Sequence, residues 1–388
     1  WVPSHFPYDA HGLFMFDGAH TYEYADMRKG FHPDWNSYVF NYKRGEVKSF
    51  LISSARFWFD RFHIDAIRVD AVSSMLKLNY SRKAGEWAPN EFGGDGNVEA
   101  IAFIKDLNET IYRDFPDVQT IAEEATDWPG VSRPTTAGGL GFGMKWMMGW
   151  MHDTLGYFKT DPLLRKYEQD RFSFSMMYFY DENFMLPLSH DEVVHGKSPM
   201  IYKMPGDDWQ KFANLRLLYT YMFTHPGAKL LFMGNEFAAT SEWNYKTELP
   251  WELLQYDPHR KMKDCVKALC FLYREEPALY ELQFSPEGFE WVDLDHRPES
   301  VIAFRRKGKD PAGDLVIVFN MTPVVRWNWK LRLSGKPAWK EIFNSDAKEY
   351  WGAGDVYNPA PALTVTDKKK NEVEINIHLP ALGAIVLK

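Results

Sequence analysis

The sequence predicts an α/β protein in which a parallel βα region is followed by an all-β domain, and three observations support this fold class. Between about residues 46 and 278, short apolar runs alternate with amphipathic helical patterns, which is the layout of parallel βα units. From about residue 279 the chain changes to short β runs separated by turns. The 388 residues, 45% of them hydrophobic, are enough for two domains, which we place at residues 1–278 and 279–388.

The first half of the βα region contains two helices and two strands. Residues 46–62 have helical periodicity, with a predicted inner stripe of Val47, Phe50, Leu51, Trp58, Phe59 and Phe62. The run "HIDAIRVDAV" follows as a buried strand, and a second helix begins at an Asn97 cap and is stopped by Pro116. The run "VQTIAEEA" is the next strand. A loop rich in Gly and Trp then occupies residues 127–150.

The same signals continue to the end of the chain. The βα region goes on with an apolar strand in residues 183–191, a helix from about Trp209 to Phe223, the strand "AKLLFMGNEF" and a helix over about residues 259–275. The second domain contains the strand runs "SVIAFRRKG", "DLVIVFNMT", "WNWKLRL", "EVEINIHL" and "GAIVLK", which predict an antiparallel β-sandwich.

Composition and charge narrow the function classes. A net charge of −8 and a pI near 5.9 argue against nucleic acid or an anionic membrane as the main partner and favour a neutral substrate. No apolar run approaches the roughly 18 to 20 residues that span a bilayer. Cys265 and Cys270 point about 140° apart on a helix, so we expect no disulfide and a reducing, cytoplasmic setting. The aromatic content of 16%, with 15 Trp, suits stacking against sugar rings.

Charged residues stand at the end of each predicted strand of the first domain. They are Arg68 and Asp70, Glu123 and Glu124, His190 and Asp191, and Glu236. In a closed parallel barrel all strands point the same way, so their C-terminal ends converge on one face, where active sites lie. We therefore expect the apolar residues to form the barrel wall and the charges to line one cleft.

Two of these carboxylates suit glycosidic-bond cleavage with retention. Arg68 and Asp70 face the same way on a strand, and an adjacent arginine lowers the pKa of an aspartate, so Asp70 is the candidate nucleophile. The neighbouring carboxylates of Glu124 and Asp191 predict a raised pKa for Glu123, the candidate general acid. Retention requires about 5 to 5.5 Å between nucleophile and acid, and we predict this separation for Asp70 and Glu123.

Each motif alone has a plainer explanation. An Arg-x-Asp sequence could be a strand ion pair, "AEEAT" a helix start, and "SHDE" a capping or metal motif. Uncompensated acids at three strand ends on one rim would destabilise the fold. We therefore expect them to have a function, which favours the functional interpretation. No metal site is predicted, because metal-binding spacing is absent among His5, His190, Asp191 and His195.

These motifs resemble those of the α-amylase clan and, within it, the bacterial 1,4-α-glucan branching enzymes, over essentially the whole chain. "FHIDAIRVDAV" is similar to the nucleophile strand, which implies Asp70 as nucleophile and Arg68 as its partner. "TIAEEATDWPGVSRP" is similar to the acid/base strand, with Glu123 in that role. "LSHDEVVHGK" is similar to the transition-state motif, which implies that Asp191 and His190 grip ring hydroxyls.

Other resemblances imply branching rather than hydrolysis. They are "MFDGAHTYEY", "NEFGG", "WMHDTLGY", "MPGDDWQKFANLR" and "LLFMGNEFA", which simple amylases resemble much less. "WVPSHF" resembles the segment after the third barrel strand, where His5 would bind the sugar at the cleavage point. The implied enzyme needs no cofactor, because the carboxylates supply the acid, base and nucleophile. The loop candidates for glucan stacking, each equally explained by packing, are Trp128, Trp146, Trp87 and Trp243.

The resemblance also implies an incomplete barrel. In relatives an Asp precedes the position of Trp1, and the first three barrel strands and one or two β-domains lie before it. Only five strands, the fourth to the eighth, are found here, whereas a closed (β/α)8 TIM barrel needs eight. The sheet edges would be exposed without the rest. We therefore expect the chain to be the C-terminal portion of a longer polypeptide, completed by another segment or chain.

Two other functions compete with branching of glycogen or amylose. An amylase-type or trehalose-releasing hydrolase of the same clan would use the same carboxylates, with water as the acceptor. A non-catalytic glucan-binding protein would fit the incomplete barrel. The presence of Asp70, Glu123 and Asp191 argues against this last class, because acids that are costly to bury tend to be lost from a decayed site.

Overall fold

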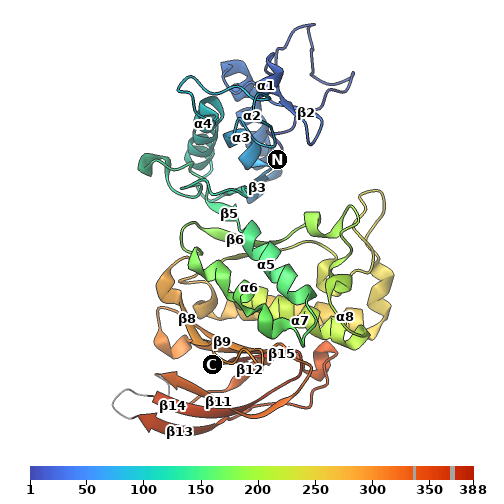
Figure 1. The fold of residues 1–388 in the computed structure, drawn as a ribbon, viewed down its shortest axis with the longest axis vertical. Helices are drawn as coiled ribbons and strands as arrows, with labels where there is room; N and C mark the ends of the chain where they lie inside the picture. The colour runs from blue at the N-terminus through green and yellow to red at the C-terminus, as the bar shows by residue number, and fades with distance from the viewer. Residues whose placement is uncertain (335–337, 368–371) are drawn as a thin grey trace. The chain divides into compact units, whose positions relative to one another are not determined.

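The chain divides into two compact units, whose elements are labelled in Figure 1. The first comprises Trp1–Met148 and Asp181–Phe184, and the second comprises Gly149–Tyr180 and Met185–Lys388. The computed structural model describes residues 1–334, 338–367 and 372–388. The boundary predicted after residue 278 lies inside the second unit, and the division into domains 1–278 and 279–388 stays a prediction.

The first unit contains a parallel sheet of the predicted kind. Its elements are α1 (Met27–Gly30), β1 (Phe31–His32), β2 (Ser37–Tyr38), α2 (Gly45–Phe62), β3 (Ala66–Val69), α3 (Val72–Leu76), α4 (Val98–Asp114), β4 (Gln119–Ala122), η1 (Thr135–Ala137) and β5 (Met144–Trp146). Strands β3 and β4 pair in parallel, and so do β4 and β5. Strand β5 corrects the prediction of a loop over residues 127–150, because three residues are too few to produce a detectable alternation.

Helix α2 has two apolar faces, and the prediction of one inner stripe is wrong for three residues. The side chains buried in the core follow one another at i, i+4 spacing: Val47, Leu51, Ala55 and Phe59. Three predicted stripe members are 41%, 41% and 59% exposed: Phe50, Trp58 and Phe62. Each residue rotates the helix by about 100°, so these rings point away from the buried row. The rings of Trp58 and Phe62 contact Phe57 and each other instead.

Helix α4 follows the predicted start signal. The Asn97 side chain accepts a hydrogen bond from the Ala100 amide at 3.2 Å, which confirms the cap. The helix contributes to one apolar core together with α2 and the strands, through Phe103, Ile104, Leu107 and Ile111. This core holds the ends of β3 and β4 in place.

The second unit contains two further parallel strands and four helices. Its elements before the all-β part are α5 (Met148–Lys159), α6 (Gln169–Ser173), β6 (Phe184–Leu188), η4 (His190–Val193), α7 (Asp208–Thr224), β7 (Ala228–Leu231), η6 (Asn235–Phe237) and α8 (Asp257–Glu275). Short 3-10 helices connect them: η2 (Arg165–Tyr167), η3 (Phe174–Met177), η5 (Met200–Lys203), η7 (Trp251–Gln255) and η8 (Pro277–Leu279). Strands β6 and β7 pair in parallel from Met185↔Ala228 to Leu188↔Leu231. The helices predicted near residues 209–223 and 259–275 are confirmed as α7 and α8.

Helix α7 is buried on all sides over most of its length. It begins with a capping box, in which Asp207 accepts from the Gln210 amide and the Gln210 side chain accepts from the Asp207 amide. Every residue from Phe212 to Thr224 is buried, because the helix lies between α8 and strand β15 of the all-β part. A helix that is enclosed in this way does not need a single apolar stripe.

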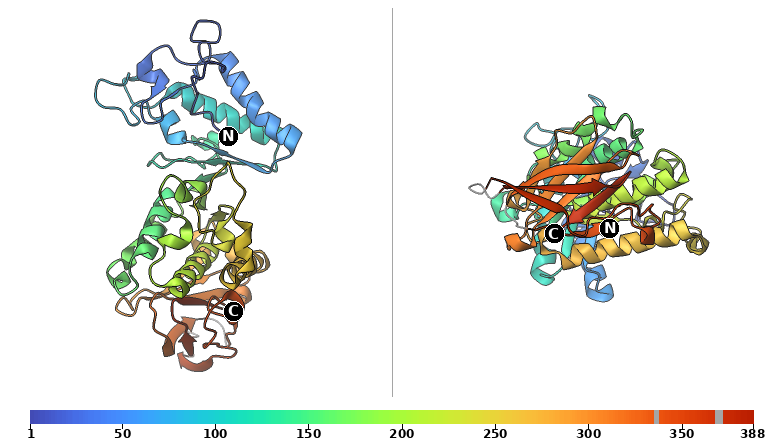
Figure 2. Two further views of the ribbon diagram at one scale, coloured as in Figure 1. Left: turned by 90° about the vertical axis from the view of Figure 1, so that its right-hand side faces the viewer. Right: turned by 90° about the horizontal axis from the view of Figure 1, so that it is seen from below.

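The all-β part is an antiparallel sandwich, as predicted. Its elements are η9 (Pro286–Gly288), β8 (Phe289–Asp293), β9 (Val301–Arg306), η10 (Pro311–Gly313), β10 (Leu315–Asn320), β11 (Arg326–Ser334), β12 (Glu341–Asn344), η11 (Lys348–Tyr350), β13 (Ala362–Asp367), β14 (Glu372–Leu379) and β15 (Gly383–Leu387). One sheet has the order β12-β15-β10-β9-β8 and the other β11-β14-β13. Figure 2 shows these sheets (orange to red) against the helices of the same unit. Their apolar core includes Val316, Val318, Leu331, Ile375 and Ile385.

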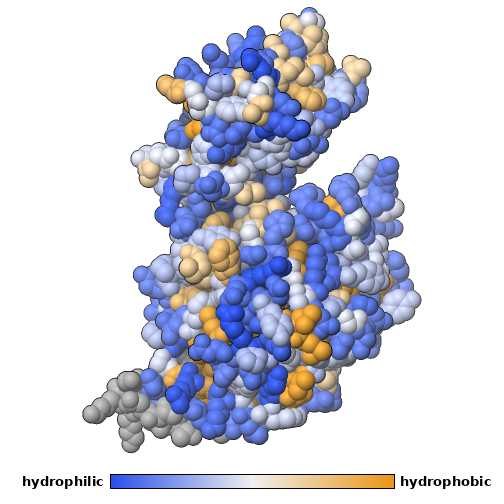
Figure 3. Space-filling model, viewed as in Figure 1, coloured by the Kyte–Doolittle hydropathy of each residue, from blue (hydrophilic) through white to orange (hydrophobic). Residues whose placement is uncertain are grey.

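The face of the molecule drawn in Figure 3 carries mostly hydrophilic residues. The face drawn in Figure 3 shows hydrophobic residues in small groups among hydrophilic ones. Within the described residues, no helix is long and apolar enough to cross a membrane. Cys265 is buried and Cys270 is exposed, and both are free thiols in the structure.

Candidate active site

One arginine holds the two candidate catalytic carboxylates of the first unit. Arg68 lies on β3, Asp70 follows that strand directly, and Glu123 follows β4. Arg68 Nη1 is 2.6 Å from Asp70 Oδ1, and Arg68 Nη2 is 3.0 Å from Glu123 Oε2. Because β3 and β4 pair in parallel with Val69 opposite Ala122, the residues after both strands come out side by side. The structure thus brings Glu123 to Arg68 and Asp70, although Glu123 lies about fifty positions further along the sequence.

The backbone after Asp70 is fixed to Glu123. The Ala71 amide donates a hydrogen bond to Glu123 Oε2 at 2.7 Å, and the Val72 amide donates to the Glu123 carbonyl at 2.9 Å. Ala71 adopts φ of 48°, in the left-handed region that residues other than glycine rarely occupy. The surrounding hydrogen bonds hold this strained turn, which is a feature typical of functional sites.

His5 supports Asp70 from the other side. His5 Nε2 is 3.2 Å from Asp70 Oδ2, and His5 Nδ1 is 3.2 Å from the Ser37 hydroxyl. Burial raises the pKa of Asp70, but the His5 hydrogen bond and the Arg68 charge outweigh burial and hold the pKa below its ordinary value. Asp70 is therefore an anion at neutral pH, as a carboxylate nucleophile must be.

Glu124 has structural contacts rather than an open position. Its side chain is fully buried, and its Oε2 lies 2.6 Å from Lys145 Nζ. Its Oε1 accepts hydrogen bonds from the Ser73 hydroxyl and the Thr126 amide, both at 2.9 Å. The charge of Glu124, which we expected to raise the pKa of Glu123, is thus balanced by Lys145. The pKa of Glu123 itself stays a prediction.

The three predicted stacking tryptophans of the first unit differ in exposure, and Trp87 is half-buried. Trp146 is only 3% exposed, and Arg68 Cζ lies 4.3 Å from the centre of its ring. This position favours the packing alternative for Trp146, as a support under Arg68. Trp128 is half-buried, with Lys77 Nζ 5.6 Å from the centre of its ring.

The remaining predicted residues belong to the second unit. His190 and Asp191 begin η4, directly after β6, and His190 Nε2 is 3.4 Å from Asp191 Oδ1. The prediction that Asp191 joins Asp70 and Glu123 around one glucose unit stays a prediction. In the described part of the chain, no group of three or more His, Cys, Asp or Glu side chains could hold a metal ion.

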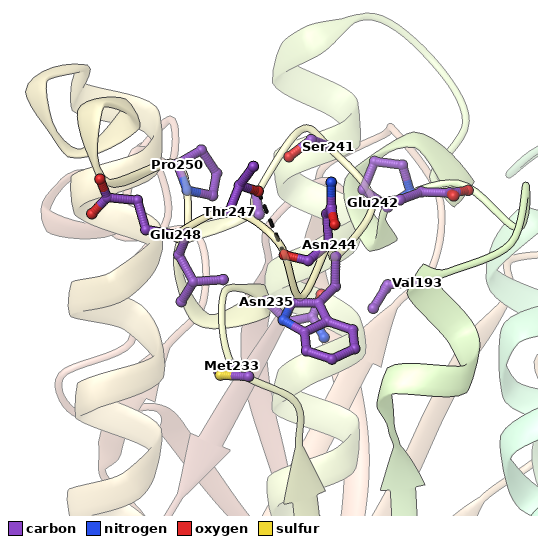
Figure 4. A pocket seen from close by; sticks show the side chains of 13 residues that line it. Val193, Met233, Asn235, Ser241, Glu242, Asn244, Thr247, Glu248 and Pro250 are labelled. Atoms are coloured by element: carbon purple, nitrogen blue, oxygen red, sulfur yellow. Dashed lines mark hydrogen bonds between the residues drawn. The ribbon is translucent and has the colours of Figure 1, made fainter. Parts of the chain in front are cut away.

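A pocket lies in the second unit where the loops after β6 and β7 meet (Figure 4). Its lining includes Val193 of η4, Asn235 of η6 and Trp243. The Glu242 carboxylate accepts hydrogen bonds from the amides of Gly196 and Ser198 at 3.0 and 2.7 Å. The Trp243 amide donates to the Val193 carbonyl at 2.9 Å. These bonds hold the segment that follows the His190–Asp191 motif against the loop after β7.

Several functional contacts were missed in the sequence. Ser37 reaches His5, the Ala71 amide reaches Glu123, and Lys145 pairs with Glu124. For Lys145 a signal existed, since a lysine inside the apolar run "MKWMM" needs a buried partner. For Ser37 and the Ala71 amide no sequence signal existed, because both contacts join segments that are distant in the sequence and meet only in the folded chain.

We expect the replacement of Arg68 by Gln to move the acid limb of the rate profile to higher pH. The Arg68 charge is one of the causes that lower the pKa of Asp70, so its removal raises that pKa. Asp70 then becomes protonated, and unable to attack, at a higher pH than in the parent. The measurement is the pH dependence of turnover on amylose, the substrate that the resemblance of the motifs implies. The Arg56→Gln variant, which breaks a pair with Asp114 on the surface, is the control and should leave the profile unchanged. An unshifted acid limb in Arg68→Gln would contradict this account.

Comparison with known proteins finds similar sequences and solved structures of similar fold. The alpha amylase, C-terminal all-beta domain family matches residues 291–388. The chain is 56% identical, over 100% of its length and 61% of the relative, to 1,4-alpha-glucan branching enzyme GlgB of Aquifex aeolicus (strain VF5). It is 54% identical, over 100% of its length and 54% of the relative, to the enzyme of the same name in Rubrobacter xylanophilus. The chain thus spans about half to three fifths of these curated relatives.

Solved structures with low sequence identity share the fold. A pullulanase from Bacillus acidopullulyticus has a TM-score of 0.68 at 12% identity, over 99% of this chain and 45% of that chain. An alpha-amylase from Geobacillus thermoleovorans, complexed with acarbose, has a TM-score of 0.63 at 14% identity, over 100% of this chain and 75% of that chain. The predicted fold class, part of a (β/α)8 barrel followed by an all-β domain, is confirmed.

Proposed function

We propose that this chain, which is 56% identical to a 1,4-alpha-glucan branching enzyme over 61% of that relative, carries the catalytic groups of a retaining transglycosylase. The reaction cleaves an α-1,4 bond of a linear glucan and transfers the released segment to a 6-hydroxyl, which forms an α-1,6 branch. The observation that carries the proposal is the contact of Asp70 and Glu123 with the single guanidinium of Arg68. Two carboxylates gathered in this way suit a double displacement.

In the first step, Asp70 attacks the anomeric carbon and the bond to the departing glucan oxygen breaks. Glu123 gives its proton to that oxygen, so the released chain leaves with a new hydroxyl and the other segment stays as an ester of Asp70. The lowered pKa of Asp70 supports its role, since the group must be ionised to attack. His5, His190 and Asp191 are assigned to the hydroxyls of the glucose unit that reacts.

In the second step, an acceptor glucan replaces the released chain. Glu123, now a carboxylate, takes the proton of an acceptor 6-hydroxyl. The oxygen of that hydroxyl attacks the anomeric carbon, and the bond to Asp70 breaks. Water in place of the acceptor would give hydrolysis by the same steps. No cofactor enters either step.

The free thiols of Cys265 and Cys270 suit a reducing compartment, and we place the enzyme in the cytoplasm.

We further propose that additional βα segments, from the same polypeptide or another chain, complete the barrel. Support comes from the second apolar face of α2, where Phe57, Trp58 and Phe62 are 49%, 41% and 59% exposed. Beside β3, Trp1 donates to the Arg68 carbonyl at 2.9 Å and accepts from the Asp70 amide at 3.1 Å. This is the bonding pattern of a parallel strand. A helix of the additional segments would cover the second apolar face of α2, and a strand of these segments would continue the pairing beside β3.

An amylose assay tests both proposals. Residues 1–388 alone, and the protein that also carries the complementary βα segments, are each incubated with amylose. We expect the larger protein to lower iodine staining while it generates few reducing ends, because each cleaved bond is replaced by a branch. A hydrolase would generate reducing ends in step with the loss of staining, and a non-catalytic binder would change neither. Equal activity of residues 1–388 alone would contradict the completed barrel.

A further inference from the structure

We infer that Trp35 and Tyr80 form a stacked aromatic platform that binds a glucose ring of the glucan next to Asp70. The inference rests on the proposed function and extends the binding site beyond the residues that the motifs identify. The Trp35 and Tyr80 rings are 5.6 Å apart between centroids, with 20° between their planes. Both residues belong to the first unit, as Asp70 does.

The platform adjoins the nucleophile through His5. The edge of the His5 ring meets Trp35 at 4.5 Å between centroids and 77° between planes. His5 Nε2 is in turn 3.2 Å from Asp70 Oδ2. The platform is therefore one imidazole ring away from the attacking carboxylate, a distance suited to a sugar unit close to the reacting one.

Tyr80 also lies within electrostatic range of the acid/base residue. Burial, followed by the charges of Glu123 and Asp34, raises the pKa of the Tyr80 hydroxyl. The Tyr80 side of the platform thus feels the charge of the candidate acid/base, and the Trp35 side adjoins the nucleophile through His5. A ring bound there would lie beside the bond that is cleaved.

Exposure distinguishes this pair from a packing pair. Tyr42 and Phe103 stack in nearly the same geometry, at 5.2 Å and 19°, and are 1% and 0% exposed. Trp35, by contrast, is 42% exposed although it contacts Tyr80, His5 and His32. Covering this exposed indole with the apolar face of a ligand is favourable, so Trp35 can contribute binding free energy that the buried pair cannot.

The chemistry of the pair fits a neutral sugar. A pyranose ring presents flat C–H faces with hydroxyls at its rim, and indole and phenol rings present flat apolar faces with a polar group at one edge. Stacking would place the sugar face on the aromatic surface and leave its hydroxyls to polar groups nearby. Neither motif analysis nor spacing singled out Trp35 or Tyr80.

Binding of maltoheptaose, measured by calorimetry, tests the platform. The background is the full-length protein with Asp70→Ala, so that the ligand is not consumed. We expect Trp35→Ala and Trp35→Leu to weaken binding about tenfold, because the flat ring is lost, and Trp35→Phe to stay within about threefold. Trp327→Ala is the matched control. Trp327 is also exposed, to 57%, and its ring centroid is 5.2 Å from that of His378. It differs from Trp35 in that it lies on β11 of the β-sandwich.

The possible outcomes distinguish failure of the platform from failure of the proposed function. Unchanged affinity in Trp35→Leu or Trp35→Ala would overturn the platform, as would an equal loss in Trp327→Ala. If Trp35→Ala does not fold, as thermal unfolding would show, the difference between Trp35→Phe and Trp35→Leu decides. Failure of the proposed function has another signature, since the parent protein would then either leave the iodine staining of amylose unchanged or generate reducing ends in step with its loss.

Discussion

Replacement of Asp70 by alanine is expected to lower the turnover of amylose by about 10⁴-fold or more. The change removes the group that forms the covalent intermediate, and the remaining carboxylate of Glu123 cannot perform both displacements. Losses of this order are typical when a catalytic nucleophile is removed while the rest of the site persists. The measurement is the initial rate of loss of iodine staining with the full-length protein.

The matched control for this variant is Asp60→Ala. Asp60 is also an aspartate next to an arginine, since its carboxylate is 3.2 Å from Arg61, but its side chain is 61% exposed on α2. We expect this control to keep the parent rate. Thermal unfolding of both variants checks that the fold is intact. A rate for Asp70→Ala within tenfold of the parent would remove Asp70 from the mechanism.

Replacement of Lys145 by methionine is expected to destabilise the protein by about 3 to 5 kcal/mol. Glu124 is fully buried, and Lys145 Nζ is its cationic partner at 2.6 Å. Methionine conserves most of the side-chain volume, so the main effect is an uncompensated charge in the core. The free energy of unfolding, obtained from denaturant titration, measures the effect.

The control for this variant is Lys48→Met. Lys48 pairs with Asp106, but both side chains are partly exposed, so we expect a loss below about 1 kcal/mol. A double variant, Glu124→Leu with Lys145→Met, should recover part of the stability, because no charge is then left buried. A loss of less than about 1 kcal/mol in Lys145→Met alone would show that the pair matters no more than a surface ion pair.

Local patterns in the sequence were sufficient for elements with strong periodicity or clear caps. The Asn97 cap of α4, the extents of α7 and α8, and the five predicted strand runs of the sandwich agree with the structure. Each depends on neighbours within a few residues, such as a side chain that accepts a hydrogen bond three residues on. The sandwich strands β8, β12 and β13 and the short strand β5 were not predicted, although β8 and β13 each pair with the next strand along the chain and only β12 pairs with a distant one, β15.

The faces of α2 show why periodicity alone was not enough. The helix has aromatic residues on more than one side, and nothing in its own sequence says which side the core covers. The structure buries the row of Val47, Leu51 and Phe59 and leaves Trp58 and Phe62 exposed. That choice depends on α4 and the strands packed against α2, which the sequence of the helix does not contain.

The sequence by itself determined the fold class, the candidate carboxylates Asp70 and Glu123, and the kind of chemistry, because residue type and order along a strand carry these. Only the tertiary structure decided that both carboxylates contact Arg68 and that Glu124 pairs with Lys145. It also decided that Trp35 lies against His5. The physical reason is that side-chain contacts depend on distance in space, and the register of parallel strands sets that distance for residues about fifty positions apart.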